Sequence, residues 1–115
     1  MDNSGEQDKG KGHRQRLRDK FALRGIDALN DDEVLELLLT LGTPRRDCKE
    51  SARLLLQKFG SLAAVLEATI FELQTVAGIG AQNSFAIHFI QSVARRYLNQ
   101  RLRSKNYLRS SREVG

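Results

Sequence analysis

The sequence predicts an all-α protein, a compact bundle of about five to six short helices. Apolar residues recur at helical spacing in the longer segments, and no stretch alternates with a period of two for long enough to form a strand. Most of the nine glycines and the one proline, Pro44, stand between these segments, where they end helices. Several segments also begin with residues spaced as in a capping box, which marks the start of a helix.

The first two predicted helices differ in character. Residues 13–24 fit a short amphipathic helix, because Leu17 and Phe21 are four residues apart and share a face. The next helix begins at the capping pair Asn30 and Glu33 and ends at Gly42. Since this second helix is apolar on most sides, we expect it at the centre of the bundle.

Three shorter helices are predicted between residues 47 and 75. Their expected caps are Asp47 with Glu50, Ser61, and Thr69 with Glu72. Gly60 is expected to end the first of them.

The last predicted helix runs from about residue 81 to residue 102. Its apolar residues form two adjacent rows of i,i+4 spacing, namely Phe85, Phe89, Val93 and Tyr97 in one and Ala86, Ile90, Ala94 and Leu98 in the other. The polar side chains expected opposite these rows, in water, are Ser84, His88, Gln91 and Arg95.

A glycine turn, Val76-Ala77-Gly78-Ile79-Gly80, stands directly before this last helix. Glycines allow a tight hairpin with uncovered backbone N–H groups, and the helix that follows begins with unpaired N–H donors. Together these donors form a small electropositive notch suited to a phosphate oxygen, while Ile79 can turn inward and hold the hairpin to the core. The pattern is typical of a helix-hairpin-helix, a motif that binds nucleic-acid backbone.

A weak internal repeat extends this interpretation. Leu39-Thr40-Leu41-Gly42 resembles Gln74-Thr75-Val76-Ala77, and each stretch leads from one helix into another. Two such hairpins around a pseudo-twofold axis would make a doubled helix-hairpin-helix domain. The turn of the first unit carries Pro44, Arg45 and Arg46 in place of the glycine pair.

The candidate nucleic-acid-binding residues come from these two turns. They are Gly78, Ile79, Gly80, Gln82, Asn83, Arg45 and Arg46. DNA-binding hairpins often carry a lysine two or three residues after the second glycine, where this chain has Gln82 and Asn83, which bring no charge. The alternatives are a structural helix corner that needs glycine and, for the two arginines, pairing with Asp47 or nearby carboxylates.

Composition fits a polyanionic partner. The chain has 115 residues and a net charge of +5, and basic residues gather in stretches 9–24 and 95–112. A pair of solvated tails is the alternative interpretation of these stretches. The single cysteine, Cys48, excludes an internal disulfide and favours the reducing cytoplasm, and no apolar run approaches the length of a membrane span.

Nothing in the sequence indicates catalysis or a metal site. His13 and His88 are the only histidines, and no His, Cys or Asp cluster has the spacing of metal ligands. We therefore expect no catalytic residue, metal or cofactor within this chain, and we expect Cys48 and His88 to have no chemical role.

Taken together, these segments resemble the N-terminal part of the bacterial RadC family over roughly residues 12–102. The matching stretches are Gly12-His13-Arg14-Gln15-Arg16-Leu17-Arg18, Leu29 to Leu39, Thr43-Pro44-Arg45-Arg46-Asp47, Phe59-Gly60-Ser61-Leu62, Gly78-Ile79-Gly80 and Ala94-Arg95-Arg96-Tyr97. The resemblance implies a link to DNA repair and a following zinc metalloprotease-like domain of the JAB1/MPN type, which this chain would lack. Zinc is implied only for that domain.

This resemblance and the residue patterns lead to one hypothesis and one alternative. Residues 1–11 are predicted to be a disordered leader, residues 12–102 the helix-hairpin-helix domain, and residues 103–115 a linker toward the second domain. We expect a non-catalytic, cytoplasmic module that binds DNA without sequence preference. The alternative is a module that docks a protein partner or its own C-terminal domain and binds no nucleic acid.

Overall fold

The fold is all-α in every residue that the structure, a computed structural model, describes: the backbone of residues 2–42 and 48–114, with side chains for residues 12–42 and 48–104. This confirms the predicted fold class. The helices are α1 (Asp2–Arg24), the 3-10 helix η1 (Ile26–Ala28), α2 (Asp31–Gly42), α3 (Lys49–Phe59), α4 (Leu62–Glu67), α5 (Ile70–Leu73) and α6 (Ala81–Val114).

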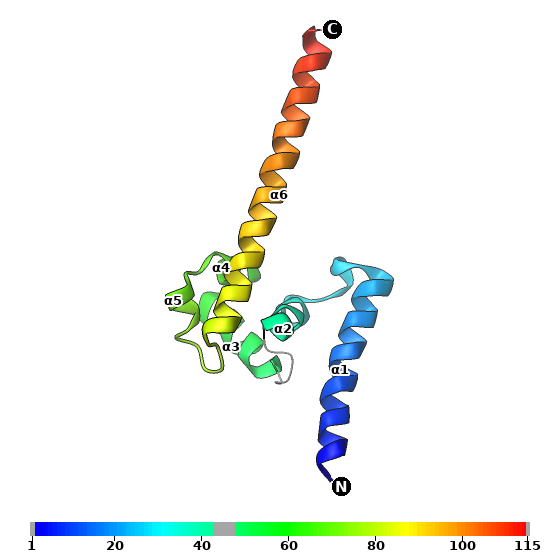
Figure 1. Cartoon of the computed structure of the whole chain (residues 1–115), viewed down its shortest axis with the longest axis vertical. Helices are drawn as coiled ribbons and strands as arrows, with labels where there is room; N and C mark the ends of the chain where they lie inside the picture. Colours follow the sequence, from blue (N-terminus) through cyan, green and yellow to red (C-terminus); the bar gives the residue numbers. More distant parts are fainter. Residues whose placement is uncertain (1, 43–47, 115) are drawn as a thin grey trace.

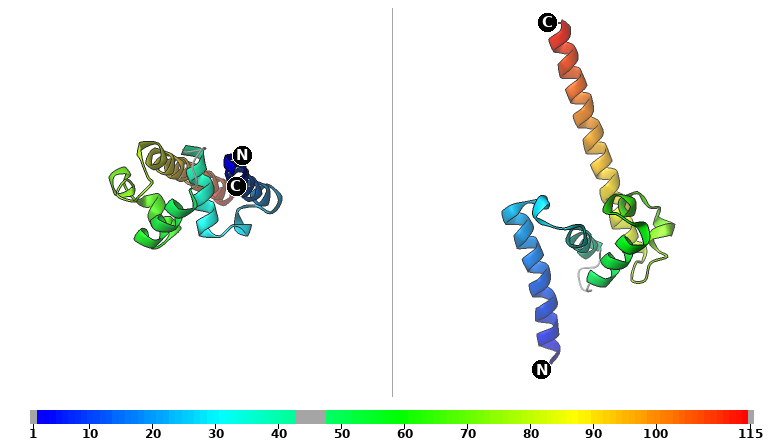
Figure 2. Two further views of the ribbon diagram at one scale, coloured as in Figure 1. Left: turned by 90° about the horizontal axis from the view of Figure 1, so that it is seen from below. Right: turned by 180° about the vertical axis from the view of Figure 1, so that it is seen from behind.

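A compact body carries two projecting helices. Helices α2 to α5 and the first part of α6 pack together, while α1 and the rest of α6 extend away from this body in different directions (Figures 1 and 2). The projections make the molecule 71 Å long and 34 Å across. The order of helix pair, connector and helix pair is the predicted one, and the doubled hairpin motif itself stays a prediction.

Helix caps form where the sequence predicts them. The Glu33 N–H donates to Asn30 Oδ1 at 2.9 Å, and the Asn30 N–H donates to Glu33 Oε1 at 3.0 Å. Thr69 and Glu72 form the same reciprocal pair at 3.1 and 2.9 Å, and Ser61 caps α4 through its hydroxyl oxygen. These caps satisfy helix N–H groups that would otherwise lack acceptors.

The start of α3 is the exception. Asp47, its predicted cap, lies outside the described residues, and Cys48 occupies the N-cap position of α3, where its side chain is buried. Gly60 ends α3 in the left-handed conformation, as predicted.

The core surrounds α2, which packs against α6, α3 and α1. Its fully buried side chains come from each layer of the body, and they include Leu35, Leu39, Leu55, Val65, Leu73 and Ile87. The central position predicted for α2 is therefore confirmed.

Helix α1 contacts α2, and two pairs of ionisable side chains join them. Leu17 is buried, Lys20 Nζ lies 3.1 Å from Glu33 Oε1, and His13 Nε2 lies 2.7 Å from Glu36 Oε2. The Glu33 carboxylate thus joins the cap of α2 to α1.

Both long helices extend beyond their predicted ends. Helix α1 begins at Asp2, within the predicted leader 1–11, and α6 continues to Val114, through the predicted linker 103–115. No proline interrupts either stretch, and no glycine occurs between Ala81 and Val114. Residues 103–114 include Arg, Lys, Leu and Glu, which are good helix formers, so the polar composition of this stretch is compatible with a helix.

The face of α6 that meets the core differs from the expected one. Ser84, expected in water, is fully buried beside Ile87, whereas Phe85 and Phe89 are 60% and 54% exposed. The reason is the close approach of α2 at Gly42, where a Cβ atom would lie 3.1 Å from the Gln82 carbonyl oxygen. Small side chains permit this approach, so the large rings are left outside.

Candidate nucleic-acid interface

The glycine turn is a tight structure anchored by one apolar side chain. The Ile79 N–H donates to the Val76 carbonyl at 3.1 Å, and the Val76 N–H donates to the Leu73 carbonyl at 3.1 Å. Gly78 has φ of +86°, a value that favours glycine. Ile79 is 6% exposed and belongs to the core, as its predicted inward turn requires.

Helix α3 contacts the turn through Ser51. A Cβ atom added to Gly78 would lie 2.3 Å from Ser51 Oγ, so only glycine fits without a shift. The Ser51 hydroxyl also donates to the Ala77 carbonyl at 3.3 Å. Glycine at position 78 is thus needed both for its backbone conformation and for the contact with α3.

Gly80 marks the open side of the turn. It is exposed, and no heavy atom lies within 4 Å of the position that a Cβ atom would take. Its carbonyl accepts from the Ser84 N–H at 3.0 Å and from the Ser84 hydroxyl at 2.8 Å, which ties the turn to the first turn of α6. The N–H groups at the start of a helix have no acceptor within that helix, so the amino end of α6 meets solvent beside Gly80.

Gln82 and Asn83 have different surroundings. Gln82 is exposed beside Gly80, but Asn83 is 5% exposed and its amide donates to the Gly78 carbonyl at 3.4 Å. The structure therefore brings Gly78, Gly80 and Gln82 together at the surface and places Asn83 beneath the turn. Arg45 and Arg46 lie outside the described residues.

Two basic side chains of α3 are engaged with neighbours. Lys58 donates to Thr75 Oγ1 and lies 5.6 Å from the centre of the Phe59 ring. Arg53 Nε donates to Glu50 Oε2 at 3.2 Å, and this contact lowers the pKa of the Glu50 carboxyl. The contact between Lys58 and Thr75 joins residues 17 positions apart, which no local sequence pattern could have indicated.

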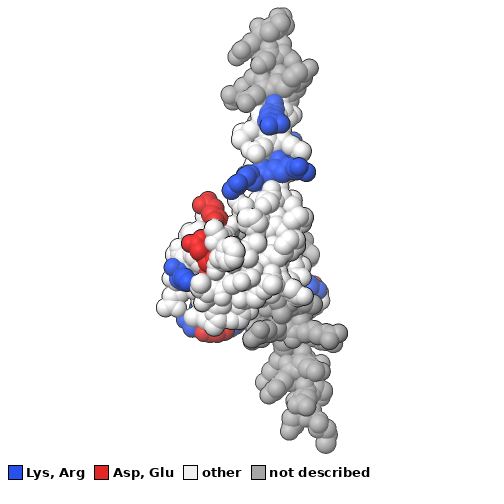
Figure 3. Space-filling view, turned by 60° about the vertical axis from the view of Figure 1, so that its left-hand side comes forward, with Lys and Arg blue, Asp and Glu red and all other residues white. Residues whose placement is uncertain are grey.

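Further basic residues gather along α6 beyond the body. Arg95, Arg96, Arg101 and Arg103 are exposed there, and Figure 3 shows Lys and Arg side chains gathered on this part of the helix. At about 1.5 Å per residue, Arg95 lies roughly 20 Å along the helix from Gly80. The notch and the arginines are therefore separate features of the surface.

Other candidate chemistry is sparse among the described residues. They contain no group of three or more His, Cys, Asp or Glu side chains that could hold a metal ion. His88 is exposed and Cys48 is buried in the core. No helix in the described ranges is long and apolar enough to cross a bilayer.

A helical body with a glycine turn at the amino end of its longest helix defines a small all-α domain. The chain belongs to the UPF0758 family, since the model of the UPF0758 N-terminal domain matches residues 11–85. This confirms the resemblance to the N-terminal domain of RadC-like proteins.

Similar relatives occur in several bacteria. The chain is 49% identical over 69 residues to a UPF0758 protein of Fusobacterium nucleatum, a match that covers 60% of this chain and 30% of the relative. It is 38% identical over 98 residues to a UPF0758 protein of Ruegeria pomeroyi, covering 85% of this chain and 44% of the relative. A UPF0758 protein of Paraburkholderia phytofirmans is 37% identical over 97 residues, covering 84% and 38%. The chain thus spans less than half the length of these relatives, and no solved structure is significantly similar to it.

Proposed function

We propose that this domain is a non-catalytic module that binds the DNA backbone without reading its sequence, through the turn at residues 78–80. One observation carries the proposal: Ile79 is anchored in the core while Gly80, beside the amino end of α6, is open to solvent. A rigid turn that presents backbone N–H groups and a helix amino end suits a phosphate oxygen.

In this proposal the residues of the turn have distinct roles. The backbone N–H groups at Gly80 and Gln82 contact the phosphate, and the exposed Gln82 amide adds a neutral hydrogen bond. Asn83 is a positioning residue, because its amide donates to the Gly78 carbonyl from beneath the turn. Contacts of this kind fix a protein on the backbone and carry no sequence information.

Charge must come from elsewhere, since positions 82 and 83 hold no lysine. Arg95 and Arg96 on α6 can reach further phosphates of the same duplex, because DNA carries a phosphate about every 3.4 Å along each strand. Arg45 and Arg46 are proposed to add to this basic surface. With few phosphate contacts, binding should be weak at physiological salt, and the fall of log K with log salt should have a correspondingly small slope.

A salt titration tests this function. Binding of the chain to duplex and single-stranded DNA of unrelated sequences is measured over a range of salt concentrations by fluorescence anisotropy. We expect similar affinity for each duplex and a linear fall of log K with log salt, with a slope of about −0.9 for each phosphate neutralised. Absence of binding at low salt, or binding without a salt slope, would refute the proposal.

A second function, protein docking, is favoured by a different observation. Phe85, Phe89 and Tyr97 are each more than half exposed on α6. Exposed apolar patches of this kind mark sites of protein interaction. We propose further that in longer family members the module tethers the metalloprotease-like domain implied by the RadC resemblance, and that any zinc belongs to that domain.

A further inference from the structure

The side of α6 that faces away from the core carries a continuous row of apolar side chains. The α6 stripe, defined as Phe85, Phe89, Val93 and Tyr97, has i,i+4 spacing, and its members are 51–60% exposed. The rings of Phe85 and Phe89 are stacked, with centroids 5.7 Å apart. Water surrounds this stripe in the isolated chain, although its members are among the largest apolar residues of the helix.

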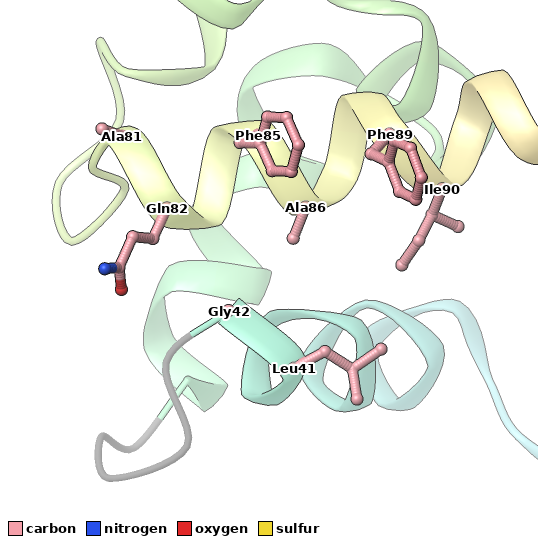
Figure 4. A pocket seen from close by; sticks show the side chains of 8 residues that line it. All are labelled: Leu41, Gly42, Ala81, Gln82, Phe85, Ala86, Phe89 and Ile90. Atoms are coloured by element: carbon pink, nitrogen blue, oxygen red, sulfur yellow. The ribbon is translucent and has the colours of Figure 1, made fainter.

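A hollow lies beside the first half of the stripe. It has a volume of about 580 Å³ and lies between the end of α2 and the start of α6. Leu41, itself 66% exposed, lines it on α2, and Ala86 and Ile90 line it on α6 together with the two phenylalanines (Figure 4). The hollow exists because Gly42 brings the helix axes close while the large side chains remain outside.

We infer that the α6 stripe and this hollow are the interface of a homodimer, in which a second copy packs its own stripe against them with the two α6 helices running in opposite directions. Residues at i,i+4 spacing form the ridge that interlocks with an equal ridge on another helix, at a crossing angle of about −50°. A twofold axis between Phe89 and Val93 sets Phe85 of each copy against Tyr97 of the other.

Charge determines the direction of the pairing. Residues 81–94 carry no Asp, Glu, Lys or Arg, whereas residues 95–104 carry four arginines and no acid. Parallel helices would place Arg95 and Arg96 of one copy against the same residues of the other, which is repulsive. Opposite directions place these arginines along the uncharged half of the partner, beside its phenylalanine rings, where cation–π contacts are favourable.

The exposed apolar area is sufficient for a stable pair. The three aromatic side chains of the stripe, each more than half exposed, leave roughly 350 Å² of apolar surface in water, taking about 200 Å² for a whole side chain. Val93 and Leu41 add roughly 100 Å². A standard interface buries about 800 Å² from each partner, and in a homodimer about 65% of it is apolar, or roughly 520 Å². The exposed side chains supply most of this area.

This inference takes up the docking function proposed above and names its occupant. Gln82 lines the hollow as well as the proposed phosphate site, so the two surfaces adjoin, but the dimer is tested by mass and needs no DNA. A partner with acidic residues around an apolar helix would also suit the arginines, but two copies need no further component because the stripe matches itself. The self-matching geometry and area favour a second copy.

Sedimentation equilibrium over a concentration series tests the inference. We expect the mass to rise with concentration from the 13.0 kDa of one chain toward twice that value. Phe89→Glu should weaken the association at least about 30-fold, the effect typical of a central interface residue. Phe71→Glu is the matched control, since Phe71 is an exposed phenylalanine of α5 outside the stripe, at 83% exposure. Circular dichroism melts confirm that both variants fold.

A distance measurement tests the direction. A spin label at Ser104→Cys reports the separation of the two copies, while native Cys48 is shielded by burial. Ser104 lies about 13 residues from the proposed axis, so opposite helices place the two labels roughly 40 Å apart and parallel helices place them close together. A short distance would overturn the antiparallel arrangement.

Two other outcomes overturn the dimer. One is a chain of single mass at every concentration, and the other is an association that Phe89→Glu leaves unchanged or that Phe71→Glu weakens equally. If the chain is a monomer and binds a hydrophobic dye such as ANS, and Phe89→Glu abolishes the dye binding, then the homodimer is refuted but docking of another protein is not. A monomer without stripe-dependent dye binding would refute docking as well.

Discussion

Replacing Gly78 with alanine perturbs the turn at its most constrained point. The new side chain has two costs, because φ at this position is +86° and because its Cβ would lie 2.3 Å from Ser51 Oγ. The left-handed conformation costs an L-residue about 1–2 kcal/mol. Displacing the Ser51 side chain also removes its hydrogen bond to the Ala77 carbonyl, which contributes about 1 kcal/mol. We therefore expect Gly78→Ala to lower the free energy of unfolding by about 2–3 kcal/mol.

Urea denaturation measures this loss, and two further variants separate its causes. Gly80→Ala is the matched control, since it adds the same methyl group two residues away, where no atom lies within 4 Å and φ is not positive. Its free energy of unfolding should change by less than about 0.5 kcal/mol. In the double variant Gly78→Ala, Ser51→Ala the clash with Oγ is gone, so the two losses should not add and a coupling of about 1 kcal/mol should appear. A loss below about 0.5 kcal/mol for Gly78→Ala, or an equal loss for Gly80→Ala, would refute the described turn.

Two other predictions concern the caps. Asn30→Ala removes the acceptor for the Glu33 N–H and should lower the free energy of unfolding by about 1 kcal/mol. Asn30→Asp keeps an acceptor oxygen and should retain most of the stability. An unchanged melting temperature for Asn30→Ala would contradict the cap. The pKa of Glu33 is lowered from its ordinary value of 4.5, first by the hydrogen bond from the Asn30 N–H and then by Lys20. Because its folded pKa is depressed, this stabilisation is present above pH 4.5 and is lost as the pH falls through the folded pKa. As the pH falls through this range, the free energy of unfolding should therefore decrease less in Glu33→Gln than in the wild type. Equal pH profiles for the two proteins would exclude a contribution from the Glu33 carboxylate.

The helix starts were predictable because their signals are local. Asn30 with Glu33, and Thr69 with Glu72, lie three residues apart, so the sequence alone contains both partners of each hydrogen bond. Gly60 ends α3 for an equally local reason, since its left-handed conformation favours glycine. The inward turn of Ile79 could also be predicted, because burial in the core removes this apolar side chain from water.

The orientation of α6 was not predictable in the same way. Both of its apolar rows have helical spacing, but the fully buried side chains are Ser84 and Ile87, which belong to neither row, and periodicity does not show which face meets the body. The contact between Gly42 and the first turn of α6 decides this, and it joins residues 40 positions apart. Burial of Asn83 follows from the same contact, which is why a residue predicted at the phosphate lies under the turn instead.

Of the predicted site, the structure describes only the residues at the glycine turn, since Arg45 and Arg46 lie outside the described residues. Gly78, Gly80 and Gln82 lie together as the sequence suggested, but the supporting contacts from Ser51 and Lys58 come from α3 and depend on tertiary packing. The exposure of the α6 stripe could not be predicted from the sequence, because a row of large apolar residues on a helix is normally buried.

The effect of Gly80→Glu on DNA affinity tests the proposed function most directly. The added carboxylate would stand in the open space at the amino end of α6, where it repels a phosphate, and no neighbouring atom obstructs its side chain. Ala63→Glu, at an exposed position of α4, is the control that changes net charge equally. We predict that Gly80→Glu weakens DNA binding at least about tenfold, or 1.4 kcal/mol, with an unchanged melting temperature, while Ala63→Glu has a much smaller effect. Equal DNA affinities for the two variants would contradict a phosphate site at the glycine turn.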